Sequence, residues 1–141
     1  MSTRERREEF WRSAIESPAA RSRTLVAEED GAVVGFASLG SDRDDPRIGE
    51  LYAIYVLPQR WGVGAGRALM GEVLEHLRSA RFQTAVLWVL ADNPRARSFY
   101  ERSGWCLEGE EREETLLDTP VREVRYRIGL GHVSQGLSKA L

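Results

Sequence analysis

A glycine-rich turn between a predicted strand and a predicted helix is the strongest chemical signal in this chain. An apolar run that ends at Val56 leads into Gln59, Gly62, Gly64 and Gly66, and an amphipathic pattern follows. Backbone N–H groups in such a turn, and at the start of the helix behind it, have no partner in the chain and attract anions. Glycine lets an anion reach the backbone and permits a positive φ. The turn therefore indicates a ligand that carries phosphate.

Three phosphate-binding patterns can be compared with this turn. A P-loop requires Lys after the glycines, but the single Lys of the chain is Lys139. A dinucleotide fingerprint requires a third Gly where this chain has Arg67, so that match is weak. The third pattern, Q-x-x-G-x-G, is matched in full by Gln59, Gly62 and Gly64. In this respect the turn resembles the acetyl-CoA pyrophosphate loop of the GNAT superfamily of N-acetyltransferases. The alternative is a glycine-rich turn that only joins a strand to a helix.

A second segment strengthens the resemblance. Residues Asn93 to Trp105 are similar to the GNAT pattern N-x-x-A-x-x-F-Y-x-x-x-G-[FW]. Asn93 suits a helix N-cap, and Gly104 is placed to end the helix. Core packing explains Phe99, whereas the hydroxyl of Tyr100 needs a polar partner. Two such segments in this order make a chance match improbable.

The resemblance implies that acetyl-CoA is the cosubstrate. Backbone groups near Tyr55 and Val56 would pair with the pantetheine amides, and the glycine-rich turn would hold the pyrophosphate. Arg60 could add positive charge, since a guanidinium matches phosphate oxygens, or it could be a solvated loop residue. Trp61 could cover the turn or the adenine, and Asn93 would position the pantetheine. The expected cofactor-binding residues are Tyr55, Val56, Gln59, Arg60, Trp61, Gly62, Val63, Gly64, Ala65, Gly66 and Asn93.

The resemblance also implies direct attack of an amine on the thioester. The amine must be neutral to attack, and the leaving thiolate gains from protonation. Tyr100 matches the family's position for a general acid, with a structural tyrosine as the alternative. Glu50 is the candidate base or water-orienting group, with a solvated strand-end glutamate as the alternative. A carboxylate there would favour a cationic acceptor, either a small-molecule amine or a protein amine.

The elements that must position these residues alternate between helices and strands. Their order matches a GNAT-like, three-layer α/β fold. We expect a mostly antiparallel central sheet, helices on both faces, and a splayed strand pair at the acetyl-CoA cleft. The predicted helices are Arg4–Glu16, Gly64–Ala80 and Pro94–Ser103, and the predicted strands are Leu25–Ala27, Val33–Leu39, Ile48–Val56, Thr84–Leu90, Trp105–Leu117 and Arg122–Leu130. Asp30 and Gly31 are the expected turn of the first hairpin, and residues 118–120 that of the last. Residues 41–47, which include Asp42, are expected to form an exposed polar loop.

One departure from the family concerns the N-terminal part. GNAT domains usually begin with a strand and a helix before the segment that here starts at Arg4, and this sequence shows neither. The strand normally lies at the sheet edge, and the helix normally helps to wall the acceptor pocket. Because exposed sheet edges are usually covered, we expect a homodimer; a start upstream of Met1 is the alternative. The same departure leaves open a non-catalytic domain that binds acyl-CoA and regulates a partner.

Length and composition predict a single domain over residues 1–141, with 131–141 as a loose tail. A net charge of −2 gives no footprint for nucleic acid, and the chain has no apolar run of membrane-spanning length. No His or Cys has neighbours at metal-ligand spacing, so we expect no metal. The lone Cys106, expected to be buried, and a charged N-terminus without a signal-peptide pattern indicate the cytoplasm.

Overall fold

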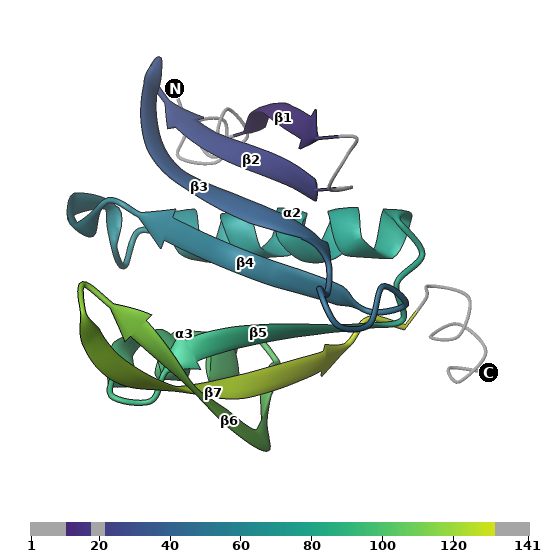
Figure 1. Cartoon of the computed structure of the whole chain (residues 1–141). Helices are drawn as coiled ribbons and strands as arrows, with labels where there is room; N and C mark the ends of the chain where they lie inside the picture. Colours follow the sequence, from purple (N-terminus) through teal and green to yellow (C-terminus); the bar gives the residue numbers. More distant parts are fainter. Residues whose placement is uncertain (1–10, 18–21, 132–141) are drawn as a thin grey trace.

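The computed structural model describes residues 11–17 and 22–131, which form one seven-stranded sheet with two α-helices (Figure 1). The strand order is β1-β2-β3-β4-β5-β7-β6, and only the β4–β5 pair is parallel. This arrangement confirms the expected mixed, mostly antiparallel fold. The strands are β1 (Trp11–Ser17), β2 (Ser22–Glu29), β3 (Ala32–Ser41), β4 (Gly49–Val56), β5 (Thr84–Leu90), β6 (Cys106–Leu116) and β7 (Thr119–Gly129); the helices are α2 (Ala65–Ser79), α3 (Pro94–Arg102) and the short 3-10 helix η1 (Pro58–Arg60).

Both α-helices pack against the same face of the sheet. Helix α2 buries Leu69, Val73 and Leu77 completely, as its apolar spacing predicts. Helix α3 lies beside it, because a Cβ built on Gly66 of α2 would be 3.3 Å from the Phe99 ring of α3. Among the described residues no helix covers the opposite face. The expectation of helices on both faces is therefore met on one face alone.

The predicted N-terminal helix is wrong over residues 11–16, which form the edge strand β1 instead. This strand pairs antiparallel with β2, for example Ile15 with Thr24. The unpaired backbone groups along β2 favour a pairing strand, and this tertiary contact outweighs a helical spacing of apolar residues. Strand β1 thus takes the edge position that the sequence analysis expected to be empty. The rest of the predicted helix, residues 4–10, and the predicted tail beyond residue 131 lie outside the described residues.

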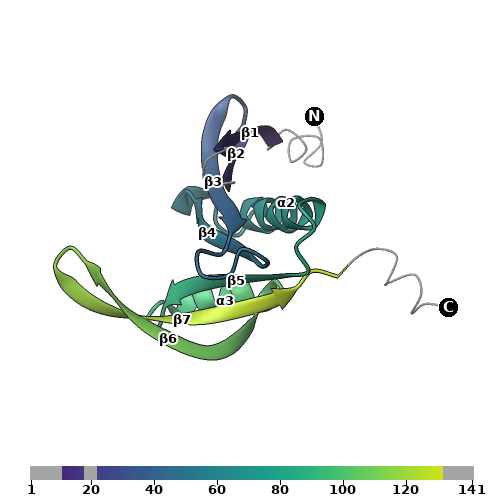
Figure 2. The same ribbon diagram turned by 45° about the vertical axis from the view of Figure 1, so that its right-hand side comes forward.

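Two tight turns join the antiparallel pairs. Asp30 and Gly31 form the predicted β2–β3 turn, both with positive φ. The β6–β7 turn consists of Leu117 and Asp118, one residue earlier than expected, with φ of 50° and 64°. Figure 2 shows that the hairpin of β6 and β7 extends away from the rest of the sheet.

The start of β6 corrects one further prediction. Cys106 is exposed, whereas its neighbour Trp105 is buried. Successive side chains of an extended segment point to opposite sides, so only one of the two can face the core. Across the described residues, no helix is both long and apolar enough to cross a membrane.

Candidate functional site

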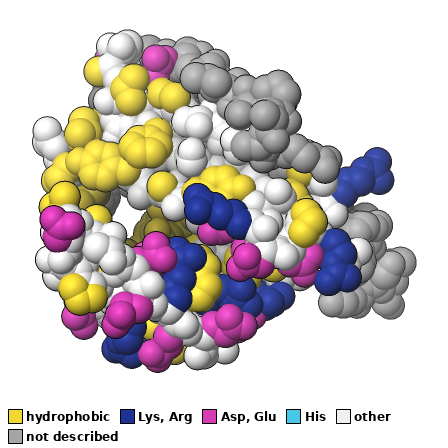
Figure 3. Space-filling view, in the orientation of Figure 1, with side chains coloured by type: hydrophobic (Ala, Val, Ile, Leu, Met, Phe, Trp, Pro, Cys, Tyr) yellow, Lys and Arg dark blue, Asp and Glu magenta, His cyan; other side chains and the backbone are white. Residues whose placement is uncertain are grey.

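A cleft opens where strands β4 and β5 separate. The two strands pair only through residues 49–51 of β4 and 85–87 of β5, and the rest of β4 diverges (Figure 1). Figure 3 shows the molecule hollowed between the diverging ends, with hydrophobic side chains in the depth of the hollow. The predicted splay is thereby confirmed. Half of each strand's hydrogen-bonding groups are left without a strand partner there.

The direction of the β4 backbone decides which of its groups face this cleft. Leu57 donates its N–H to Val34 of β3 at 2.9 Å. Because backbone groups alternate along a strand, Tyr55 also bonds towards β3, while Ile54 and Val56 present theirs to the cleft. The carbonyl of Val56 accepts a bond from the Trp61 indole at 2.9 Å, on the cleft side. Of the two predicted residues, only Val56 thus offers backbone groups to a ligand, and Ile54 is a candidate that the sequence analysis missed.

The glycine-rich turn starts helix α2 at the open end of the cleft. Gly62 and Gly64 have φ of 83° and 93°, which explains the need for glycine at both positions. A Cβ built on Gly62 would meet nothing within 4 Å, so the backbone there is open to a ligand. Within the described part of the chain, none of the backbone N–H groups of residues 62–67 makes a well-formed hydrogen bond. Helix α2 also has no side-chain cap, so its positive end is free for an anion.

The loop's aromatic residue contacts both sides of the candidate site. Trp61 is 45% exposed, and the guanidinium of Arg95 lies 3.8 Å from its ring centroid. Arg95 belongs to the first turn of α3, so this cation–π contact joins the loop to that helix. Gln59 is exposed beside it in η1. Together these contacts bring the two motif segments next to each other.

Arg60 has a partner of its own. Its guanidinium forms an ion pair with Glu29 at the end of β2. Its Nε is buried and has no acceptor among the described residues. Arg60 is therefore anchored next to the loop by its ion pair with Glu29.

Helix α3 presents Tyr100 from within the core. Asn93 caps this helix as predicted, since its side chain accepts a bond from the N–H of Ala96 at 3.1 Å. Tyr100 is 9% exposed and touches the rings of Trp105 and Tyr126. Burial raises the pKa of Tyr100 to about 12. Its hydroxyl has no hydrogen-bond partner among the described residues, so the proton it carries can be offered to a ligand.

Glu50 is buried rather than solvated, with 8% of its surface exposed. It lies on β4 at the closed end of the cleft, where Glu50 pairs with Val86. Burial raises the pKa of Glu50 to about 7, aided by Asp42, which favours the protonated form as an acceptor for its proton and through its negative charge. A carboxyl group with this pKa can exchange protons near neutral pH. Leu51 points into the core that contains Tyr100, so the adjacent Glu50 faces the opposite side of the sheet.

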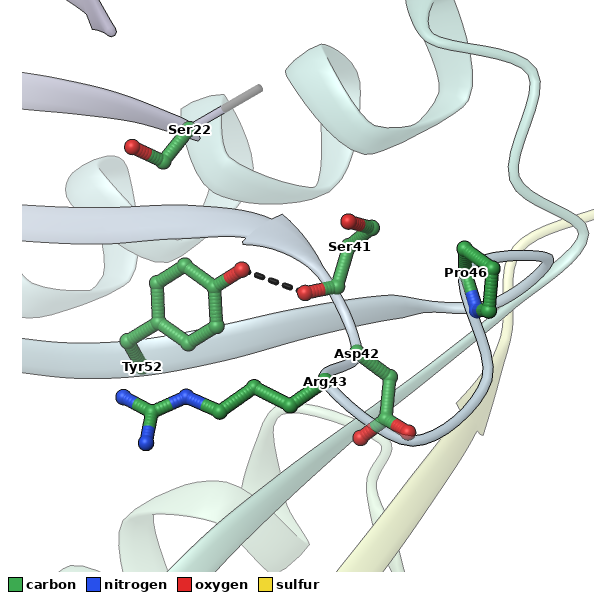
Figure 4. Close-up of a pocket in the computed structure, with 6 residues that line it drawn as sticks. All are labelled: Ser22, Ser41, Asp42, Arg43, Pro46 and Tyr52. Atoms are coloured by element: carbon green, nitrogen blue, oxygen red, sulfur yellow. Dashed lines mark hydrogen bonds between the residues drawn. The ribbon is translucent and has the colours of Figure 1, made fainter. Parts of the chain in front are cut away.

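A surface hollow of about 550 Å³ lies between β4 and the loop that carries Asp42 (Figure 4). Tyr52, which lines it, is two residues along β4 from Glu50 and so is on the same face of the sheet. Tyr52 crosses it and donates its hydroxyl to the carbonyl of Ser41. Arg43 lies 6.0 Å from the Tyr52 ring centroid. Asp42, expected to be exposed in a polar loop, is only 6% exposed because it accepts bonds from its own loop. The hollow is lined by Ser22, Ser41, Asp42, Arg43, Pro46 and Tyr52.

An open strand edge beside an uncapped, glycine-rich helix start is a site for a ligand that carries both amides and phosphate. The profile of the acetyltransferase (GNAT) family matches residues 2–105, and the chain belongs to this family. The chain is 42% identical over 81 residues to a mycothiol acetyltransferase of Streptomyces griseus, covering 57% of this chain but only 26% of that protein.

Two solved structures show the same fold. Nourseothricin acetyltransferase has a TM-score of 0.67 and 29% identity, covering 80% of this chain and 68% of that one. The protein yncA of Salmonella typhimurium, solved with its cofactor acetyl-CoA, has a TM-score of 0.69 and 21% identity, covering 82% of this chain and 68% of that one. The fold of this chain is therefore that of known GNAT proteins.

Proposed function

We propose that this chain is an acetyl-CoA-dependent N-acetyltransferase that acts on a primary amine by direct attack. The observation that carries the proposal is the unpaired edge of β4 leading into the free N–H groups of residues 62–67. Bound acetyl-CoA would supply an activated acetyl group as a thioester. Its pantetheine would pair with Ile54 and Val56, and its pyrophosphate would lie on the loop N–H groups.

The other predicted contacts have support of different kinds. Trp61 and Arg95 form a flat, cationic surface next to the loop, suited to the adenine or its phosphates. Arg60 is held beside the loop by its ion pair with Glu29, where its positive charge would attract the phosphates. Asn93 is explained by its capping bond and would position the pantetheine only through the start of α3. The proposed cofactor-binding set is Tyr55, Val56, Gln59, Arg60, Trp61, Gly62, Val63, Gly64, Ala65, Gly66 and Asn93, with Tyr55 acting through its position in β4.

Acid and base are proposed on opposite faces of the sheet. Glu50 takes the proton of the acceptor ammonium, directly or through a water molecule, and leaves a neutral amine. A backbone N–H of β4 stabilises the negative charge that develops on the carbonyl oxygen. Tyr100 keeps its proton at neutral pH, since burial raises its pKa to about 12, and donates it to the leaving sulfur. The attacking nitrogen loses its second proton to solvent as the amide forms, and solvent returns a proton to Tyr100. The buried carboxyl of Glu50 favours a cationic acceptor, either a small-molecule amine or a protein amine.

A Tyr100→Phe variant tests this assignment. We expect turnover to fall by about 10²- to 10⁴-fold, the usual contribution of a general acid, while acetyl-CoA binding is kept. Tyr126→Phe is the matched control, because this tyrosine lies in the same cluster but its hydroxyl bonds to Glu101 at 2.6 Å and to Arg97 at 3.0 Å. The control should lose stability and keep its rate constant. Equal turnover in Tyr100→Phe and the unmodified chain would refute the acid role.

The alternative is a domain that binds acyl-CoA without catalysis. Thermal unfolding with acetyl-CoA, and with NAD and ATP as controls, separates binding from turnover. Ligand at a hundred times its dissociation constant should stabilise the fold by about 2.7 kcal/mol. A shift without turnover on a broad panel of amines would favour the alternative. A shift with NAD instead would support a nucleotide-binding module.

We further propose a single domain over residues 1–141, with 131–141 as its tail, that acts in the cytoplasm and forms a homodimer. The dimer is supported by an exposed apolar face of β3 and β4. Val33, Phe36 and Tyr55 are 56%, 39% and 47% exposed there, and no helix of the described residues covers them.

A further inference from the structure

Two carboxyl groups meet beneath the hollow next to β4. Asp42 and Glu50 are 6% and 8% exposed. Glu50 pairs with Gly40 of β3, and the N–H of Asp42 bonds to Ile48, so the two carboxyl groups are diagonal neighbours on one face of the β3–β4 pair. Asp42 acts on Glu50 there to raise its pKa. Asp42 comes from the loop after β3, whereas Glu50 comes from β4 itself. Neither has a salt bridge among those of the described residues. Burying two carboxyl groups side by side destabilises the native state when both are ionised, so stabilisation of the fold does not explain the pair.

The loop holds Asp42 in place for this contact. Its Oδ2 accepts the N–H groups of Asp44 at 3.1 Å and Asp45 at 2.9 Å. Its own N–H donates to the carbonyl of Ile48 at 2.9 Å, which closes the loop. Both side-chain bonds are accepted by Oδ2, and Oδ1 takes part in neither of them. One face of the carboxylate is thus fixed by the backbone and the other is left for Glu50.

Charged groups from several elements face the pair. Arg43, from the same loop, and Arg112, from β6, both act to lower the pKa of Glu50. Arg125 of β7 is close enough to Asp42 to gain from its charge. The Glu50 charge is likewise felt by Tyr52, whose pKa is raised mainly by burial. Since the arginines oppose protonation of Glu50, burial and Asp42 are what favour its proton.

We propose that Asp42 is a positioning residue for Glu50: its carboxylate accepts a hydrogen bond from the protonated Glu50 carboxyl, and the two groups share one proton. Under the proposed function, Glu50 takes one proton from the acceptor ammonium, which becomes a neutral amine, and Asp42 then holds that proton. The proton leaves to solvent through the hollow that Asp42 lines, which restores the Glu50 carboxylate. The role in catalysis rests on the proposed function, whereas the shared proton does not.

The first test needs no activity. Carboxyl 13C NMR of the full chain follows the titration of Glu50, assigned by its loss in Glu50→Gln. We expect a midpoint near 7 in the unmodified chain, falling by about one pH unit in Asp42→Asn. Asn keeps an oxygen that accepts both loop N–H bonds, so this variant preserves the turn.

Asp44→Asn is the matched control. It removes the same charge from the same loop, but Asp44 is exposed and contributes only its backbone N–H to the pair. Its Glu50 midpoint should stay within about 0.3 pH units of the unmodified value, because exposed charges are screened.

The NMR titration of Glu50 tests the shared proton without any measurement of activity. An ordinary glutamate midpoint in the unmodified chain would overturn it, as would equal shifts of the Glu50 midpoint in Asp42→Asn and Asp44→Asn. The second test is the pH profile of kcat/KM for an amine acceptor, whose acidic limb should move with the NMR midpoint in Asp42→Asn. A shared proton without turnover on any amine would uphold the pairing and count against the proposed function alone.

Discussion

Replacing Glu50 by Gln should make the folded chain more stable at pH 8. The native environment raises the pKa of this carboxyl from 4.5 to about 7, chiefly through burial and secondly through Asp42. Each pKa unit corresponds to about 1.4 kcal/mol, so ionised Glu50 costs the native state about 3 kcal/mol. Gln has nearly the same shape, carries no charge and can donate a hydrogen bond to Asp42. It therefore removes the penalty while it keeps the contact.

The sign of the pH dependence follows from proton binding. Native Glu50 holds its proton more tightly than the unfolded chain does, so the unmodified protein loses stability as the pH rises from about 4.5 to about 7. Below this window both states are protonated and the difference between Glu and Gln is small. Above it the full difference appears. Other titrating groups are shared by the two proteins and cancel in the comparison.

Urea unfolding at pH 5, 6, 7 and 8 measures this difference. We expect the stability gain of Glu50→Gln to be small at pH 5 and to reach about 3 kcal/mol at pH 8, about 10 °C in Tm. Glu114→Gln, at an exposed position of β6, is the control and should change stability little at any pH. A gain for Glu50→Gln that is equal at pH 5 and pH 8 would refute the raised pKa. The gain should come with loss of acetyl transfer, because the base is gone.

Three further substitutions test the loop and one turn. Gly62→Ala places a side chain at a residue whose φ is 83°, so we expect the free energy of unfolding in urea to fall by about 1 kcal/mol. Calorimetry should show roughly tenfold weaker acetyl-CoA binding, and an unchanged Kd would contradict the loop assignment. Trp61→Phe keeps an aromatic ring but removes the donor to the Val56 carbonyl, so acetyl-CoA should bind about 2- to 10-fold more tightly. Weaker binding would mean that the indole itself, through its ring or its N–H, serves the ligand. Leu117→Asn should add about 1 kcal/mol to the unfolding free energy, because Leu117 is 92% exposed at φ of 50° and Asn tolerates that conformation, and no gain would show that the turn is unstrained.

The parts of the fold that sequence predicted well are those set by local chemistry. The glycine-rich turn, the capped start of α3 at Asn93 and the Asp30–Gly31 hairpin each depend on a few neighbouring residues. Glycine, asparagine and proline limit the backbone whatever surrounds them. The splay of β4 from β5 was predictable only through the family resemblance, because no residue pattern encodes the partner that a strand lacks.

The failures have a common physical origin in contacts between distant segments. Residues 11–17 have a helical spacing of apolar residues, but the open edge of β2 pairs them into a strand. Asp42 looks like a solvated residue of an acidic loop, and only the fold shows that it turns inward against Glu50. The acidic residues Asp44 and Asp45 that follow it gave no signal for this burial. The N–H and C=O of Ile54 face the cleft because of the register between β3 and β4, which cannot be predicted from the sequence.

The position of the only thiol supports direct transfer over a covalent acyl-enzyme. Cys106 is exposed at the start of β6 and pairs with Arg127 of β7, whereas the cleft lies between β4 and β5. Two strands therefore separate Cys106 from the edge of β4. The structure instead has a buried carboxyl, Glu50, on one face of the sheet, and on the other the hydroxyl of Tyr100, which has no partner among the described residues. These are the two groups that the proposed one-step transfer uses, because the amine loses its proton on one side while the sulfur gains one on the other.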